Sequence, residues 1–268
     1  MKKVISIGEA LIDFIPNQNG AKLKNVSEFR RVAGGAPANV SAVVAKLGGK
    51  SSFISKLGKD AFGDYIIDVL NEVNVNTDYV LRTSKANTGL AFVSLKEDGN
   101  RDFSFYRNPS ADMLLEADEV KKEWFNNCHI LHFCSVDLID SPMKLAHKKA
   151  IEYALESNSI ISFDPNIRLP LWDSEQSCKK AISEFLPFAH IVKISDEELE
   201  NSKLALVNSM KSITDNIGGM SDFVFSQSMA KTNSEVQDII SSIEKVTKKD
   251  IVEAIKNIEL DTVYFLRN

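Results

Sequence analysis

The sequence lacks any block of lysines and arginines, and its net charge of −5 arises from both signs mixed along 268 residues. Without a basic patch to gather phosphates, neither nucleic acid nor an anionic membrane surface is favoured as a partner. No window approaches the roughly 18 consecutive apolar residues of a membrane span. The apolar start is interrupted at Gly8 and Glu9, too early for the core of a secretory signal. We therefore expect a soluble chain.

Cysteine is also scarce, with only Cys128, Cys134 and Cys178 in the sequence. An odd and sparse set does not suit a disulfide scaffold and favours a reducing compartment, so we expect a cytoplasmic protein. Two of the cysteines lie beside histidines, but His129 and His132 would point to opposite faces of a strand. One metal ion could not easily collect them, so structural histidines and buried thiols are the favoured interpretation.

Glycine and proline are missing from long stretches of the chain. There is no glycine between Gly99 and Gly218, and no proline after Pro187. Beyond about residue 200, apolar residues recur at helical spacing. This change of composition predicts a mostly helical tail over residues 200–268.

Before residue 199, short apolar runs alternate with helical patterns. This alternation predicts an α/β fold with a parallel sheet covered by helices on both faces. A hairpin is also expected, because Asp98-Gly99 separates two segments of alternating polarity. With the chain near Asp13, it predicts a second, smaller sheet from about residues 10–33 and 86–108. The expected strands of the main sheet are 3–7, 52–55, 129–133, 160–163 and 191–194, and the expected helices are 37–47, 65–73, 142–156 and 174–185.

The strongest local pattern runs from Gly34 to Gly63. It contains Gly34-Gly35-Ala36-Pro37-Ala38-Asn39-Val40-Ser41, then Gly48, then Gly58-Lys59-Asp60-Ala61-Phe62-Gly63. The pattern resembles the first signature of the PfkB (ribokinase-like) carbohydrate kinases, and residues 1–199 are similar in order to that family's fructokinases. The resemblance implies a ribokinase-like three-layer fold with a small β lid. It also implies ATP-dependent phosphoryl transfer, with magnesium, to a sugar hydroxyl.

The resemblance places sugar contacts at Asp13, Gly34, Gly35 and Asn39. A carboxylate at Asp13 offers several acceptor sites to neighbouring hydroxyls. The glycine pair lets the backbone approach a ligand, and an asparagine can both donate and accept hydrogen bonds. In the lid, Arg107 corresponds to an arginine that the family places over the sugar. The alternative is a strand-end aspartate beside a loop with a helix cap.

The segment Asp164-Pro165-Asn166-Ile167-Arg168 resembles the family's Asp-Pro-Asn-x-Arg. It follows an expected strand, and the carboxyl ends of parallel strands face the ligand crevice. The resemblance assigns Arg168 to the transferring phosphoryl group, and Asp164 and Asn166 to the sugar or metal-bound water. A simple Asp-Pro-Asn turn is the alternative.

The segment from Lys193 to Glu198 resembles the family's Asn-x-x-Glu element, with Ser195 in place of the asparagine. The resemblance implies that Lys193 and Ser195 contact ATP and that Glu198 orients magnesium through water. Serine is shorter than asparagine, and Glu197 could take the place of Glu198 in register. Both assignments therefore remain open.

The family's second signature, which ends in Gly-Ala-Gly-Asp, does not occur in the chain. In the family its aspartate takes the hydroxyl proton, and its glycine amides form the anion hole. The run Gly218 to Phe223 has the wrong spacing, and Asp222 follows Glu198 too soon for the strands and helix of an adenine site. We therefore expect a truncated kinase domain with impaired turnover.

The tail carries a second pattern, in Leu206 to Asp215, Asp222-Phe223, Ser226-Gln227, Val246 to Ile251 and Leu260 to Leu266. These runs are similar to the C-terminal end of insulinase-type (pitrilysin family) zinc peptidases, and the last predicts a short strand. The zinc motif His-x-x-Glu-His is absent from the chain, so no peptidase activity follows.

Three hypotheses remain open from the sequence. The chain is an impaired fructokinase-type enzyme, a non-catalytic hybrid that binds sugar, or a protein whose tail mediates protein interactions. Because a sheet cut after the strand at Lys193 leaves an open edge, a homo-oligomer formed through that edge or through the lid is a further expectation.

Overall fold

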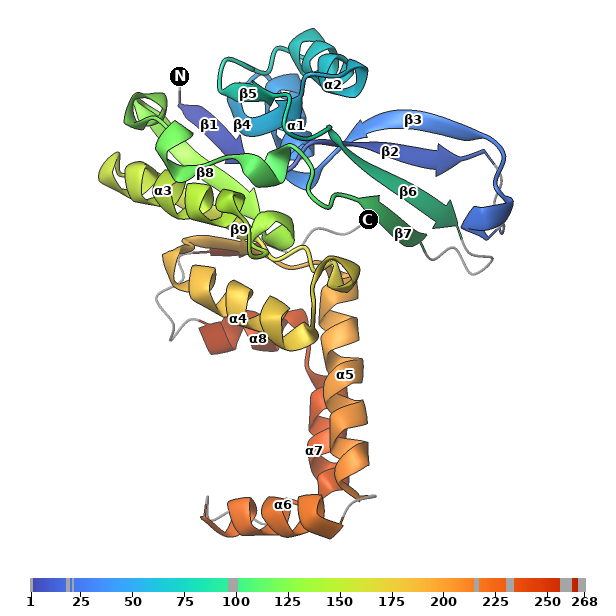
Figure 1. Cartoon of the computed structure of the whole chain (residues 1–268). Coiled ribbons are helices and arrows are strands. Elements are labelled where there is room, and N and C mark those ends of the chain that lie inside the picture. The colour runs from blue at the N-terminus through green and yellow to red at the C-terminus, as the bar shows by residue number, and fades with distance from the viewer. Residues whose placement is uncertain are drawn as a thin grey trace. The chain divides into compact units, whose positions relative to one another are not determined.

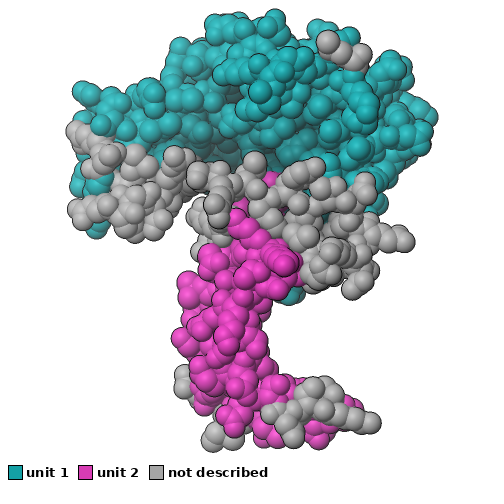
Figure 2. Space-filling view, turned by 180° about the vertical axis from the view of Figure 1, so that it is seen from behind, with its two compact units in different colours: residues 1–192 teal, residues 193–268 magenta. Residues whose placement is uncertain are grey.

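The computed structural model describes residues 2–17, 20, 22–95, 101–214, 217–229, 234–255 and 262–264. The chain divides into two compact units, residues 1–192 and 193–268 (Figure 2). The division falls within strand β10 (Ile191–Lys193), a few residues before the boundary expected at residue 199.

The first unit is built on a parallel sheet with the strand order β10-β9-β8-β1-β4-β5. The strand pairs in this order are all parallel, which confirms the predicted α/β class. The strands are β1 (Lys3–Ile7), β4 (Lys50–Gly58), β5 (Val80–Thr83), β8 (Cys128–Cys134), β9 (Ile160–Asp164) and β10.

Recognisable start signals define the helices of this unit. Pro37 lies in the first turn of its helix, where a missing amide hydrogen costs nothing. The Asp60 carboxylate accepts the amides of Phe62 and Gly63, at 3.1 and 2.8 Å, and so caps the next helix. The helices are α1 (Ala36–Lys46), α2 (Ala61–Glu72), α3 (Pro142–Glu156) and α4 (Glu175–Phe185). Short 3-10 helices lie at Leu23–Asn25, Asp112–Leu114, Ala117–Glu119, Lys122–Phe125, Ser135–Asp137, Leu169–Leu171 and Leu186–Phe188.

A smaller sheet with the order β3-β2-β6-β7 projects to one side of the main sheet (Figure 1). Strands β6 and β7 pair in antiparallel register, as the hairpin prediction requires. The predicted turn at 97–100 lies outside the described residues. The strands are β2 (Leu11–Pro16), β3 (Phe29–Gly34), β6 (Gly89–Leu95) and β7 (Arg101–Tyr106).

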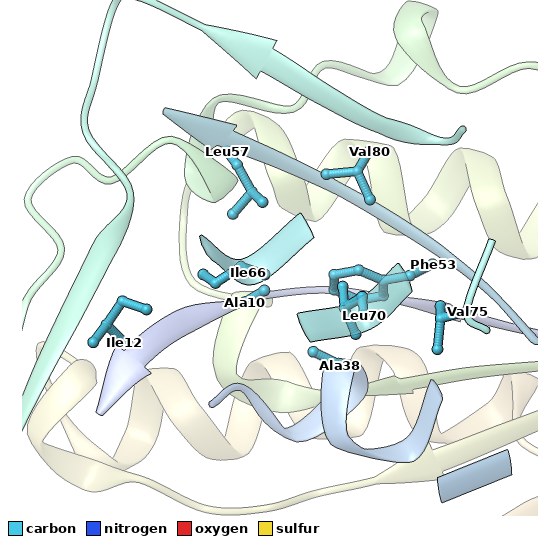
Figure 3. Packing of buried hydrophobic residues seen from close by; sticks show 9 residues of the cluster. All are labelled: Ala10, Ile12, Ala38, Phe53, Leu57, Ile66, Leu70, Val75 and Val80. Atoms are coloured by element: carbon cyan, nitrogen blue, oxygen red, sulfur yellow. The ribbon is translucent and has the colours of Figure 1, made fainter. Parts of the chain in front are cut away.

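One buried cluster packs the main sheet, the smaller sheet and the first two helices together (Figure 3). Ile12 comes from the smaller sheet and Phe53 from the main sheet, and both are fully buried. Ala10 and Ala38 belong to the same cluster and flank the junction of β3 and α1 at Gly34 and Gly35. Because close packing allows little local movement, this cluster holds the loop in place.

The second unit is mostly helical, as predicted. Its core is small, with Val207, Val236 and Ile240 buried. Thr247 and Asp250 exchange backbone-to-side-chain hydrogen bonds at the start of the last helix, which is the pattern of a capping box. The elements are α5 (Asp196–Thr214), α6 (Ile217–Met229), α7 (Val236–Lys245), α8 (Lys248–Ile255) and β11 (Thr262–Tyr264). Across the described residues, none of the helices has the length and apolar character needed to span a membrane.

Candidate functional site

Asp13 and Gly34 lie against each other on neighbouring strands. The antiparallel register of β2 and β3 pairs Leu11 with Gly34 and Asp13 with Val32. A β-carbon added at Gly34 would overlap the Asp13 carboxylate and would lie 2.8 Å from its Cγ. The carboxylate thus fills the space of the missing side chain, and a larger residue at Gly34 would have to displace it. The structure brings these two predicted residues together.

Gly35 turns the chain into α1 with a φ of +105°, a conformation that favours glycine. A β-carbon there would collide with the Glu9 carbonyl oxygen and lie 2.9 Å from Ala10 Cα. The Glu9 carboxylate also accepts the Ala36 amide at 2.8 Å and satisfies one of the free donors at the helix start. Asn39 is exposed one turn further on. Its backbone N–H donates to the Gly35 carbonyl at 2.9 Å, as part of α1.

Arg107 is buried just beyond the end of β7, with 2% of its side chain exposed. Its guanidinium forms ion pairs with Asp112 and Asp137. Its Nε and Nη1 atoms are buried and have no hydrogen-bond partner among the described residues. Burial alone would lower the pKa of Arg107, but Asp112, Asp137 and Glu9 raise it above its usual value. The predicted lid arginine is therefore locked into an ionic network and keeps unused N–H donors.

The end of β9 is connected to the Gly34-Gly35 loop by a chain of contacts. The register of β8 and β9 pairs Cys134 with Asp164. The Cys134 thiol lies 3.5 Å from Glu9 Oε2, and Glu9 holds the start of α1. Because β1, β8 and β9 are parallel, these residues share the carboxyl edge of the sheet, where ligands bind in open α/β folds.

The Asp-Pro-Asn segment forms a local turn at this edge. The backbone N–H of Asn166 donates to Asp164 Oδ1 at 3.1 Å, and Asn166 has a left-handed φ of 39°. The Arg168 guanidinium donates to the Ile167 carbonyl at 2.9 Å. The Ser135 hydroxyl donates to the Pro165 carbonyl and ties the turn to the segment after β8. The Asp-Pro-Asn segment therefore forms a turn and also lies at the carboxyl edge of the sheet, so the two interpretations of this segment do not exclude each other.

Lys193, Ser195 and Glu198 belong to the second unit. Lys193 ends β10, and the Ser195 carbonyl accepts the Leu199 amide at 3.2 Å as α5 begins. The Glu198 side chain lies outside the described part of the chain. Asp222 is an exposed residue inside α6, which begins at Ile217. The ATP and magnesium contacts of this segment remain predictions.

The sequence interpretation missed three buried acids, Glu9, Asp112 and Asp137. Glu9 had a signal, since it is a charged residue between the apolar runs of β1 and β2. Asp112 and Asp137 lie in 3-10 helices, where no periodic pattern reports burial. Among the described residues, no group of three or more His, Cys, Asp or Glu side chains could hold a metal ion.

Burial raises the pKa of Glu9 to about 7, although the Arg107 charge and the Ala36 amide lower it. The folded protein therefore binds a proton at Glu9 more tightly than the unfolded chain does. The resulting stability is fully present below about pH 4.5 and is lost as the pH rises through about 7.

We expect Glu9→Gln to remove this loss, because glutamine keeps an acceptor for the Ala36 amide and carries no charge. The free energy of unfolding of the variant, relative to wild type, should rise by about 3 kcal/mol between pH 4.5 and pH 8. Urea unfolding at several pH values measures this difference. Glu123→Gln, at an exposed position, controls for the loss of one charge. A constant difference across that range would contradict the assignment.

The chain is similar in sequence to known proteins of one family. Residues 1–225 match the model of the family described as pfkB family carbohydrate kinase, a match that extends past residue 199. A probable fructokinase-5 of Arabidopsis thaliana is 44% identical over 196 residues, which are 73% of this chain and 60% of the relative. Fructokinase-2 of Solanum lycopersicum is 45% identical over 197 residues, 74% of this chain and 60% of the relative.

Solved structures show the same fold. A fructokinase from Xylella fastidiosa with bound ATP has a TM-score of 0.67 and 39% identity, and the match covers 76% of this chain and 61% of that one. A fructokinase from Halothermothrix orenii has a TM-score of 0.67 and 32% identity, over 74% of this chain and 69% of that one. This chain spans about 60% of the length of the curated relatives named above. From its family match and its fold, the chain belongs to the pfkB family of carbohydrate kinases.

Proposed function

We propose that the first unit binds a fructose-type sugar at the carboxyl edge of its sheet and that the 268-residue chain turns it over poorly. The observation that carries the proposal is the packing of the Asp13 carboxylate on Gly34, beside the Gly35 turn and the start of α1. Fructokinases among the relatives support the choice of sugar. The unbridged cysteines support a cytoplasmic location.

The site offers both kinds of hydrogen-bonding group that a sugar needs. The Asp13 carboxylate accepts hydrogen bonds from hydroxyls, and the exposed Asn39 amide both donates and accepts. Arg107 has two buried N–H groups with no hydrogen-bond partner in the part of the chain that the structure describes, and such donors gain most from a ligand that satisfies them. Asp164 and Asn166 would position the sugar or a metal-bound water.

In the family reaction, Arg168 would neutralise charge on the transferring phosphoryl group. ATP would be held by Lys193 and Ser195, which offer donors to phosphate oxygens, and a carboxylate at Glu198 suits magnesium bound through water. A bound magnesium ion would supply charge neutralisation at the phosphates.

A general base is missing from this arrangement. The chain contains no Gly-Ala-Gly-Asp, and Asp222 is an exposed helical residue. We therefore propose that residues 200–268 do not complete the catalytic site and that sugar binding persists with little phosphorylation.

Calorimetric titration with fructose tests the binding site. Removing a charged hydrogen-bond partner costs about 1.5–3 kcal/mol, so Asp13→Asn should raise the Kd at least tenfold. Gly34→Ala should weaken binding similarly, because its β-carbon would displace the Asp13 carboxylate. Asp68→Asn, at an exposed position on α2, should leave the Kd unchanged. Absence of binding to several hexoses, or an unaltered Kd in Asp13→Asn, would refute the proposed site.

A further inference from the structure

A cleft of about 650 Å³ opens in the first unit between loops that follow β7, β8 and β9. Its walls come from residues 105–108, from 138–140 before α3, and from 170–181, which lead into and include much of α4. Small-molecule sites typically have volumes of about 300–1,000 Å³, so the cleft has room for a mono- or disaccharide.

This cleft shares only Arg107 with the proposed substrate site. Asp13, Gly34 and Asn39 do not line it, and of the proposed sugar contacts only Arg107 does. The Arg107 guanidinium is held by ion pairs to buried carboxylates. A ligand in the cleft therefore does not have to compete for the Asp13 carboxylate.

One part of the lining is apolar and includes an unused donor. Phe105, Leu138 and Leu171 contribute apolar surface, and Trp172 contributes a large aromatic ring. The Trp172 Nε1 atom is buried and has no hydrogen-bond partner among the described residues.

The other part of the lining is polar and nearly balanced in charge. Asp140, Asp173 and Lys180 are exposed at the cleft. Lys144 also lines it, and its ammonium is paired with Glu184 at 2.7 Å. The two exposed aspartates outnumber the exposed lysine, which favours a neutral ligand over a phosphate or another dianion. A hydroxyl group can donate to a carboxylate and accept from an N–H at the same time.

We propose that this cleft is a second carbohydrate site, which binds a neutral mono- or disaccharide apart from the substrate site. The apolar C–H face of the sugar packs on Trp172 and the neighbouring apolar side chains. Its hydroxyls donate to Asp140 and Asp173 and accept from Lys180. Binding in the cleft does not depend on turnover. It also does not depend on the Asp13 carboxylate, so it should persist in Asp13→Asn.

Tryptophan fluorescence provides the test, because the chain has two tryptophans and only Trp172 lines the cleft. Trp124 stacks on Tyr79 with ring centres 4.9 Å apart, so Trp124→Phe preserves an aromatic contact and leaves Trp172 as the reporter. Titration of this variant with fructose, glucose and sucrose should give a saturable emission change with at least one sugar. Adding Asp13→Asn should leave the change intact, whereas Asp140→Asn with Asp173→Asn should raise its Kd at least tenfold.

Three outcomes overturn the proposal: no emission change with any sugar, a change abolished by Asp13→Asn, or a change unaffected by the two cleft substitutions. The reverse variant, Trp172→Phe, reports from Trp124 and should show no response to sugar. If Trp124→Phe fails to fold, calorimetry on Asp13→Asn in the otherwise native chain replaces it. Sugar binding that persists in Asp13→Asn and disappears when Asp140→Asn and Asp173→Asn are added supports the cleft site. If Asp13→Asn binds no sugar, the cleft site is refuted.

Discussion

Fructose and ATP incubated with the purified 268-residue chain are expected to yield sugar phosphate at close to the uncatalysed rate. Loss of a general base typically lowers the rate by a factor of about 100 to 10,000. Loss of one anion-hole donor lowers it by a further factor of about 100 to 1,000. Both groups come from the Gly-Ala-Gly-Asp signature in the family, and the chain does not contain it.

A coupled assay of ADP release measures this rate, and two variants sharpen it. Asp222→Asn should leave the background unchanged, because Asp222 is exposed inside α6. Replacing the residues after 192 with the corresponding part of a fructokinase relative should raise the rate at least a hundredfold. Robust ATP-dependent phosphorylation by the native chain that is abolished by Asp222→Asn would show that the tail does supply the base.

Among the variants described here, Arg107→Met is expected to lower the free energy of unfolding most. The substitution keeps an apolar stem of similar length but leaves the buried Asp112 and Asp137 without their cation. Breaking a buried ion pair costs about 3–5 kcal/mol, which corresponds to a fall in Tm of roughly 10 °C for a unit of this size. Thermal unfolding followed by circular dichroism measures the change.

Two further variants identify the cause of that loss. Adding Asp112→Asn and Asp137→Asn to Arg107→Met removes the uncompensated charges and should recover part of the stability. Lys122→Met breaks an exposed pair with Glu156 and should change Tm little. A Tm for Arg107→Met within 2 °C of wild type would mean that the buried network does not stabilise the fold.

The elements of the first unit were largely predictable because local signals and packing agree there. The apolar run of β1 and the proline at the start of α3 gave both elements with their observed bounds. Strand β4 was predicted too short, because Lys56 reads as an exposed residue. In the structure Lys56 is buried, donates to the Leu114 carbonyl at 2.8 Å and pairs with Glu119. A charged side chain that is buried against partners far along the chain conceals a strand.

The site was predictable only in part, and for a related reason. The contact between Asp13 and Gly34 depends on strand pairing, and only the family resemblance pointed to it. The burial of Arg107 depends on Asp137, thirty positions away, and no local pattern reports such a partner. The role of Glu9 likewise depends on distant partners, since its carboxylate contacts the Ala36 N–H at the start of α1 and the Cys134 thiol on β8.

Calorimetric injection of fructose into the chain in the presence of magnesium and ATP records binding and turnover in one trace. We expect a saturable binding heat after each injection and a return to baseline, with the binding heat weakened by Asp13→Asn. A heat flow that stays displaced from baseline in proportion to enzyme concentration would show sustained phosphorylation. That result would contradict the claim that the chain binds the sugar but lacks the groups to phosphorylate it.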